Sequence, residues 1–211
     1  SLRTAMAGLP ASLQDIAIKV KNQSWGHREK GFRIRDYKAY SDPNYWAEVL
    51  YTKKYSRINN PTGVYGNAGD VLYVFVGQDV PDGATLTAEV ITGTSIEGKA
   101  TTLRKGLNMI PTVKDYSSLF IRYVGATSLE SDVLITDYPA LTLHVEQGVV
   151  NGFWNKEEHD DADWVDMMTN LATADVFQGK GERIMFHMST EYMSQCCPNT
   201  ITDAIGWWDD M

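Results

Sequence analysis

The middle of the chain is a succession of short apolar segments separated by turn residues, and this pattern limits the fold more than any other feature of the sequence. Over residues 84–91, apolar and polar side chains alternate, as they do in a strand with one buried face. Comparable segments occupy residues 70–76, 118–125, 131–138 and 140–148. Short connections rich in Gly, Asp, Asn and Pro join them, which favours hairpins over alternating strands and helices. We therefore expect an antiparallel β-sandwich, jelly-roll-like or immunoglobulin-like, over residues 62–146.

The residues before this region predict a helix followed by a connector. Apolar side chains recur at helical spacing within residues 10–22, behind a Pro and a Ser, so a short N-terminal helix is expected there. The segment 32–65 is rich in Tyr, Asp, Asn and Pro. It allows a short helix over 44–50 and has loop chemistry at 58–63. Residues 1–61 are thus predicted to form an N-terminal helix and a connector.

The pattern changes again after residue 146. Residues 156–172 predict a helix, residues 182–188 a strand, and residues 189–197 a short helix capped by Ser189. The buried stripe of the first helix is predicted to consist of Trp164, Met167, Met168 and Leu171. We expect residues 147–211 to be the start of an α/β unit that is incomplete, which makes the chain as a whole an α+β protein.

The last residues, 200–211, predict an amphipathic helix that has capping residues at its start and no stop signal at its end. Its apolar stripe is predicted to consist of Ile201, Ala204, Ile205, Trp208 and Met211. An apolar face of this width needs a covering element, so we expect the chain to be the front portion of a longer protein.

Charge and hydropathy exclude two classes of function. The net charge is −8, and the 19 basic residues are scattered among 27 acidic ones, which argues against a nucleic-acid partner because phosphate contacts need clustered Lys and Arg. No apolar run approaches the eighteen residues of a membrane-spanning helix, so no membrane span is expected.

The two cysteines, Cys196 and Cys197, are adjacent. Such a pair would form a strained ring, so we expect two thiols rather than a structural bridge.

None of the compact catalytic motifs occurs in the sequence: HExxH, GxSxG, a Walker loop, GxGxxG before a helix and paired CxxC are all missing. The acidic run at 157–163 is interpreted as a solvated helix entrance, because carboxylates there interact favourably with the helix dipole. The sequence therefore assigns no catalytic residue and no metal ligand. The candidates for stacking on a sugar ring are the tryptophans that lie outside helical stripes, Trp25, Trp46 and Trp154.

Several segments, taken in order, resemble one family. Residues 32–77, 103–110, 119–125 and 143–155, followed by 163–211, are similar to the amino-terminal half of the enhancin-like, mucin-targeting zinc metallopeptidases of the M60 family. The resemblance implies a β-sandwich subdomain that leads into a gluzincin-type catalytic domain. It also implies a bacterial protein, secreted or at the cell surface, that acts on glycoproteins.

The chain departs from that family at the catalytic motif. Family members depend on HExxH and a downstream Glu, in which two His one helical turn apart bind zinc and the intervening Glu is the general base. None of the histidines is followed by a Glu and a second His at this spacing: His27, His144, His159 and His187. No zinc ligand can be carried over to a position of this sequence, so zinc is expected only in the full-length parent.

Three functions remain open at this point. The first is the non-catalytic N-terminal portion of a secreted or cell-surface metallopeptidase, with a glycoprotein or glycan as partner through the full-length protein. The second is a stand-alone β-sandwich carbohydrate-binding or adhesion module without peptidase activity. The third is a purely structural domain of a cell-surface protein. We expect a monomer in each case. An HExxH motif further along the reading frame would favour the first function over the second.

Overall fold

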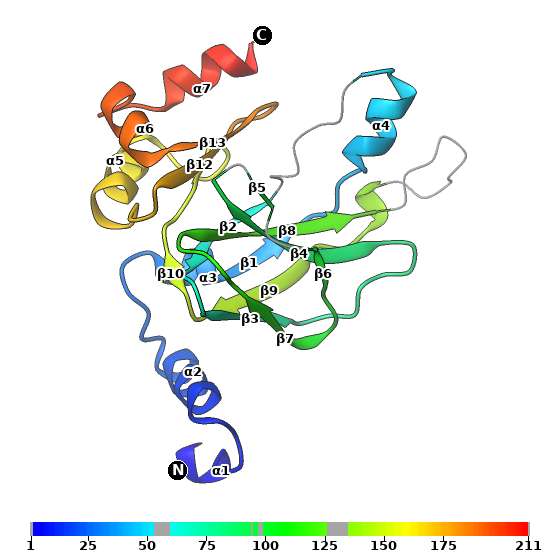
Figure 1. The fold of residues 1–211 in the computed structure, drawn as a ribbon, viewed down its shortest axis with the longest axis vertical. Helices are drawn as coiled ribbons and strands as arrows, with labels where there is room; N and C mark the ends of the chain where they lie inside the picture. The colour runs from blue at the N-terminus through cyan, green and yellow to red at the C-terminus, as the bar shows by residue number, and fades with distance from the viewer. Residues whose placement is uncertain (1, 53–59, 94, 97–98, 126–134, 211) are drawn as a thin grey trace.

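Two antiparallel sheets form the centre of the molecule (Figure 1). The computed structural model describes residues 2–52, 60–93, 95–96, 99–125 and 135–210. The first sheet has the strand order β1-β9-β3-β7. Its strands are β1 (Ile34–Tyr37), β9 (Leu141–Glu146), β3 (Val71–Val76) and β7 (Gly106–Pro111).

The second sheet has the order β10-β2-β8-β4-β5, and a short strand β6 also pairs with β4. Its strands are β10 (Val149–Val150), β2 (Pro61–Gly66), β8 (Ser117–Val124), β4 (Thr85–Thr92), β5 (Ser95–Ile96) and β6 (Thr101–Thr102). Every pairing between the strands of these two sheets is antiparallel, as the alternating segments predicted.

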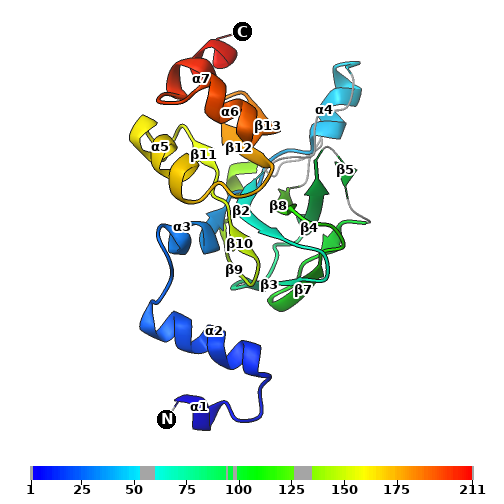
Figure 2. The same ribbon diagram turned by 60° about the vertical axis from the view of Figure 1, so that its left-hand side comes forward.

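A smaller third sheet and three helices follow (Figures 1 and 2). Its strands are β11 (Trp154–Asn155), β12 (Val176–Lys180) and β13 (Met185–Ser189). The β11–β12 pair is parallel and the β12–β13 pair antiparallel. The helices of this region are α5 (Asp161–Asn170), α6 (Thr190–Cys196) and α7 (Thr202–Asp209). The molecule is thus α+β with mostly antiparallel sheets.

The remaining helices come before or between the strands. They are α1 (Leu2–Ala5), α2 (Ala11–Asn22), α3 (Glu29–Arg33) and α4 (Pro43–Val49). In both views α1 and α2 lie at one end of the two large sheets, and α5, α6 and α7 lie at the opposite end (Figures 1 and 2). The predicted helices over 10–22 and 44–50 are confirmed by α2 and α4. No helix among the described residues is long and apolar enough to cross a membrane.

Strand alternation explains how the core forms. In β4 the side chains of Leu86 and Ala88 are buried, and in β3 those of Leu72 and Val74 are buried, whereas the residue between the two members of each pair is more exposed. These inward side chains from both large sheets belong to one hydrophobic cluster, which continues to Trp164 of α5. Burial of this shared cluster removes a large apolar surface from water, which is the main favourable term in folding.

Strand β2 corrects the loop expected at 58–63, of which residues 58–59 lie outside the described ranges. Pro61 is the first residue of the strand, where the missing N–H costs least. Gly63 adopts a positive φ of 74°, and the register with β8 shifts between Pro61 and Tyr65. A proline and a bulged glycine therefore gave a central strand the composition of a loop.

The strand expected over 131–138 is the second correction. Residues 131–134 lie outside the described ranges, and Ile135–Asp137 forms a short 3₁₀ helix, η1. The signal was a short apolar run, and periodicity alone does not separate a strand from a helical turn in such a run. Strands β1, β7 and β12 were not predicted. The connector and the segment after the first helix have no clear alternation, and the first three residues of β7 include Gly106 and Asn108, residue types that are typical of a turn.

Helix α5 confirms the predicted helix and most of its buried stripe. Trp164 and Met167 are buried, and the Trp164 indole Nε1 donates to the carbonyl of Cys197 at 2.7 Å. The side chain of Asp160 accepts from the N–H of Asp163 at 2.9 Å, and Asp163 accepts from the N–H of Asp160 at 3.0 Å. This reciprocal capping box fixes where the helix begins.

Helix α7 differs from the predicted terminal helix in the face that it buries. Ile201 and Ile205 are buried as predicted, but Trp208 is 50% exposed. Asp209 lies inward instead and accepts from the backbone N–H groups of Glu182 at 3.0 Å and Arg183 at 2.9 Å. The buried line therefore continues from residue 205 to 209 rather than to 208. Met211 lies outside the described residues.

A buried carboxylate joins the N-terminal helices to the first sheet. Glu146 of β9 accepts from Lys19 Nζ at 3.1 Å, from the Trp25 indole Nε1 at 3.0 Å and from His144 Nε2 at 2.8 Å. Arg33 Nη1 lies 3.8 Å away. Burial alone would raise the pKa of Glu146, but these hydrogen bonds and positive charges outweigh it and lower the pKa to about 2.

We expect Glu146→Gln to lower the free energy of unfolding by about 3 kcal/mol, or the Tm by roughly 6 to 12 °C, because buried Arg33 and half-buried Lys19 lose one carboxylate partner and keep only Glu29. The matched control, Asp79→Asn, removes an exposed pair with Lys105 and should cost less than about 1 kcal/mol. Since the pKa of Glu146 is lowered, its contribution is complete above the unfolded pKa of about 4.3 and is lost as the pH falls towards 2. Thermal unfolding of the two variants and of the unmodified chain, measured over a range of pH, tests the loss of stability and its pH dependence. An equal loss of Tm in Glu146→Gln and Asp79→Asn would contradict the expected role of Glu146.

Candidate functional site

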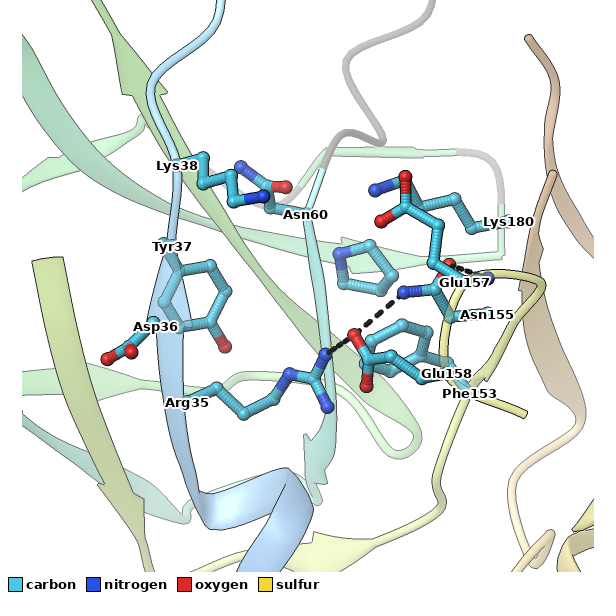
Figure 3. A pocket seen from close by; sticks show the side chains of 11 residues that line it. Arg35, Asp36, Tyr37, Lys38, Asn60, Phe153, Asn155, Glu157, Glu158 and Lys180 are labelled. Atoms are coloured by element: carbon cyan, nitrogen blue, oxygen red, sulfur yellow. Dashed lines mark hydrogen bonds and ion pairs between the residues drawn. The ribbon is translucent and has the colours of Figure 1, made fainter. Parts of the chain in front are cut away.

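A small polar pocket lies where the first sheet meets the third (Figure 3). Its walls come from β1 and the residue after it, from the start of β2, from residues 153–158 and from the end of β12. The cavity volume is about 140 Å³. This is below the volume of pockets that hold drug-sized ligands, so the space suits a smaller polar ligand.

An ion pair crosses one wall of the pocket. Arg35 Nη2 donates to Glu158 Oε1 at 2.5 Å, and the same oxygen accepts from Asn155 Nδ2 at 2.8 Å (Figure 3). The Arg35 guanidinium also lies over the Phe153 ring, 4.8 Å from its centroid, which is a cation–π contact. Burial raises the pKa of Glu158, but the hydrogen bonds and charge of Arg35 outweigh it, so that pKa is lowered. The carboxylate is therefore ionised at neutral pH.

Two buried polar atoms beside this pair have no hydrogen-bond partner within the described stretches of the chain. They are the hydroxyl of Tyr37 and Nδ2 of Asn60, both residues of the pocket lining. Tyr37 is only 4% exposed, and its burial raises the pKa of the hydroxyl, which stays protonated. An unpaired buried polar group costs about 1 to 3 kcal/mol, so native proteins rarely keep two of them in the lining of one pocket.

The rim of the pocket carries charges of both signs. Asp36, Lys38 and Glu157 are exposed, and Lys180 is half-buried. Asp36 accepts from the Thr142 hydroxyl at 2.6 Å. Three cations and three carboxylates line the pocket in all, so it has no excess of either charge.

The three predicted candidates for sugar stacking lie elsewhere, and they are not brought together. Trp25 is half-buried and donates to Glu146, while Trp46 is half-buried on α4 with its ring 5.2 Å from that of Tyr45. Trp154 is fully buried, and its indole donates to the carbonyl of Asp160 at 3.0 Å. In this structure Trp154 is a core residue and presents no face to a ligand.

The histidines do not form a metal site. His27 Nε2 lies 2.7 Å from Asp166, and His144 donates to Glu146. His159 Nδ1 accepts from the N–H of Asn155 at 3.0 Å. The remaining histidine, His187, donates from Nε2 to the carbonyl of Gly93. No three His, Cys, Asp or Glu side chains among the residues that the structure describes are placed to hold a metal ion, so these residues do not fit a catalytic zinc.

The three aspartates of the acidic run, Asp160, Asp161 and Asp163, have structural partners. Besides the Asp160 and Asp163 capping box, Asp161 Oδ1 accepts from the N–H groups of Ile201 at 2.9 Å and Thr202 at 3.0 Å. This carboxylate caps α7 from outside the helix. Burial would raise the pKa of Asp161, but the hydrogen bonds from Thr202 and Ile201 lower it to about 2. These capping carboxylates stabilise helix starts, which refines the predicted solvated entrance.

Sequence reasoning missed the polar pocket. The two charged residues that form its ion pair, Arg35 and Glu158, are 123 residues apart in the sequence, and neither belongs to a motif. The only local signal was that 34–38 places charged and aromatic side chains in a short segment without apolar alternation.

No protein-family model and no curated protein sequence matches this chain. Solved structures do match it. A metallopeptidase from Bacteroides thetaiotaomicron superposes with a TM-score of 0.82 at 32% identity, over 97% of this chain and 35% of that one. A metallopeptidase in complex with Tn antigen superposes with a TM-score of 0.73 at 34% identity, over 86% of this chain and 34% of that one. The resemblance to the M60-type metallopeptidases is confirmed.

A more distant match shows the shared fold. The M60 catalytic domain of ZmpC from Clostridium perfringens, in complex with the sialyl T antigen, has a TM-score of 0.59 at 16% identity over 79% of this chain and 35% of that one. The chain therefore spans about a third of the length of each of these three proteins. The similarity to the M60 catalytic domain of ZmpC thus concerns the fold of this portion.

We expect Tyr37→Phe to leave the Tm unchanged or raise it by roughly 2 to 4 °C, because it removes an unpaired buried hydroxyl without the loss of a hydrogen bond. The matched control is Tyr123→Phe, which removes a hydroxyl that donates to the carbonyl of Pro139 at 2.9 Å. That variant should lose about 1 kcal/mol. Thermal unfolding of the two variants gives the comparison, and an equal destabilisation by both would show that the Tyr37 hydroxyl is paired.

Proposed function

We propose that this chain is the non-catalytic, amino-terminal portion of a zinc metallopeptidase that acts on glycoproteins such as mucins. The observation that carries the proposal is the similarity to two metallopeptidases at 32% and 34% identity, which spans 97% and 86% of this chain but only about a third of theirs. One of the two is in complex with Tn antigen, a glycan antigen. Because this chain is similar to one portion of these metallopeptidases, the similarity supports the same class of activity for the full-length protein that contains it.

The donor set of the chain supports the non-catalytic character that we propose. A hydrolytic zinc site needs three protein ligands and an open position, and the histidines of this chain are dispersed and engaged in other contacts. Zinc would therefore be held by residues of the parent outside this chain. When bound there, the metal would polarise a carbonyl or activate water.

We also propose the finer fold assignment. The two large sheets contribute inward side chains to one hydrophobic cluster, which supports a β-sandwich subdomain. Residues 147–211, with their mixed third sheet and helices, would begin a gluzincin-like catalytic domain. The parent would be secreted or at the cell surface, would act as a monomer, and would meet its glycoprotein partner outside the cell.

Comparing this chain with the full reading frame that contains it tests the function. We expect the full-length product to cleave mucin, to lose that activity with a chelator, and to contain stoichiometric zinc. The chain of residues 1–211 alone should do none of these. Gel analysis of mucin and metal analysis by mass spectrometry are the measurements. Chelator-sensitive cleavage by the chain alone, or a full-length product without HExxH and without cleavage, would overturn the proposal, and the latter would favour a stand-alone carbohydrate-binding module.

A further inference from the structure

The polar pocket combines unused hydrogen-bond donors with unused acceptors in a small space. On the donor side are the Tyr37 hydroxyl and Asn60 Nδ2, which have no partner within the described residues. On the acceptor side is Glu158, whose Oε1 takes both hydrogen bonds from Arg35 and Asn155 and leaves the second oxygen for a ligand. We propose that this pocket binds one neutral sugar unit of a glycan through adjacent hydroxyl groups.

The charge balance favours a neutral ligand over an anion. The cations Arg35, Lys38 and Lys180 are matched by three carboxylates, and Arg35 is already paired with Glu158. An anion that entered would be drawn to the lysines but would also be repelled by Glu157 and Glu158 at close range. Vicinal hydroxyls avoid this conflict, because each hydroxyl donates to a carboxylate and accepts from a lysine, amide or phenol.

The size and the surfaces of the pocket agree with a single ring. The cavity of about 140 Å³ leaves room for one ring at most, and its rim is open because Lys38 and Glu157 are exposed. The Pro61 ring and the plane of the Arg35 guanidinium, which lies over Phe153, give flat surfaces for the C–H face of a sugar. A pyranose ring has hydroxyl groups around its edge and C–H groups on its faces, which matches the polar groups and flat surfaces of the pocket.

The two unpaired donors lie just behind the pocket surface, since their atoms are buried. Lys38 lies beside Asn60, and Arg35 lies beside the Tyr37 hydroxyl (Figure 3). A sugar hydroxyl would reach each donor through a small movement of the neighbouring side chain. The ligand then removes the desolvation cost that the Tyr37 hydroxyl and Asn60 amide carry in the free protein, so binding gains from both contacts. The inference rests on the proposed function only for the source of the sugar, a glycoprotein.

A titration of the 1–211 chain followed by NMR tests the site. The probes are the methyl glycosides of galactose, glucose and N-acetylgalactosamine, with acetate and sulfate as anionic probes. We expect at least one glycoside to bind with a millimolar Kd, because few hydrogen bonds are available, and neither anion to bind in its place. Chemical-shift changes should centre on the backbone N–H of residues 35–38 and 155–158.

Variants decide whether the pocket is the site. Tyr37→Phe removes a donor, and Glu157→Gln removes an exposed rim carboxylate; each should weaken glycoside binding about three- to tenfold. The matched controls, Tyr123→Phe and Glu48→Gln, lie outside the pocket and should leave Kd unchanged.

Three results would overturn the proposal: no glycoside binds, only an anion binds, or a glycoside binds with equal Kd in all four variants. Mucin cleavage by the full-length product is a separate readout. If the full-length product does not cleave mucin but the chain still binds a glycoside, the proposed function is rejected and the sugar site stands.

Discussion

The close approach of Gly63 and Gly152 holds the second sheet against the segment that leads to the C-terminal helices. Both glycines have positive φ, 74° and 76°. A Cβ on Gly63 would lie 3.0 Å from the carbonyl carbon of Gly152 and 3.0 Å from the Phe32 ring, so a side chain there would force these neighbours apart and would be strained at this φ. The carbonyl of Gly63 accepts from the N–H groups of Asn151 at 2.8 Å and Gly152 at 3.0 Å.

Asn151 extends this junction into the third sheet. Its side-chain Oδ1 accepts from the N–H groups of Thr173 at 2.9 Å and Ala174 at 2.8 Å, and its Nδ2 donates to the carbonyl of Val176 at 3.1 Å. One buried side chain thus holds the residues between α5 and β12. The polar pocket lies beside the junction, because Pro61 precedes Gly63 and residues 153–158 follow Gly152. The junction thus positions the start of β2 and Phe153, whereas Glu157 and Glu158 lie in the turn that follows β11.

The sequence predicted what depends on local pattern and missed what depends on distant contacts. Strands β3 and β4 and the Trp164 face of α5 were predictable, because alternation and helical spacing repeat within a few residues. The order of segments was enough to identify the resemblance to M60 metallopeptidases. Strand β2 was missed because Pro61 and Gly63 resemble loop residues. The pocket and the Glu146 network could not be predicted, since their partners lie more than a hundred residues apart.

Native-state hydrogen exchange tests most directly whether the junction couples the two large sheets and the C-terminal region into a single cooperative unit. We expect the slowest amides of β3 and of β12 to open with the same free energy, that of global unfolding. Asn151 and the paired glycines join β12 to the second sheet, which shares one core cluster with β3. A free energy of opening for β12 that lies about 2 kcal/mol or more below that of β3 would show that the C-terminal region unfolds by itself, and would contradict this coupling.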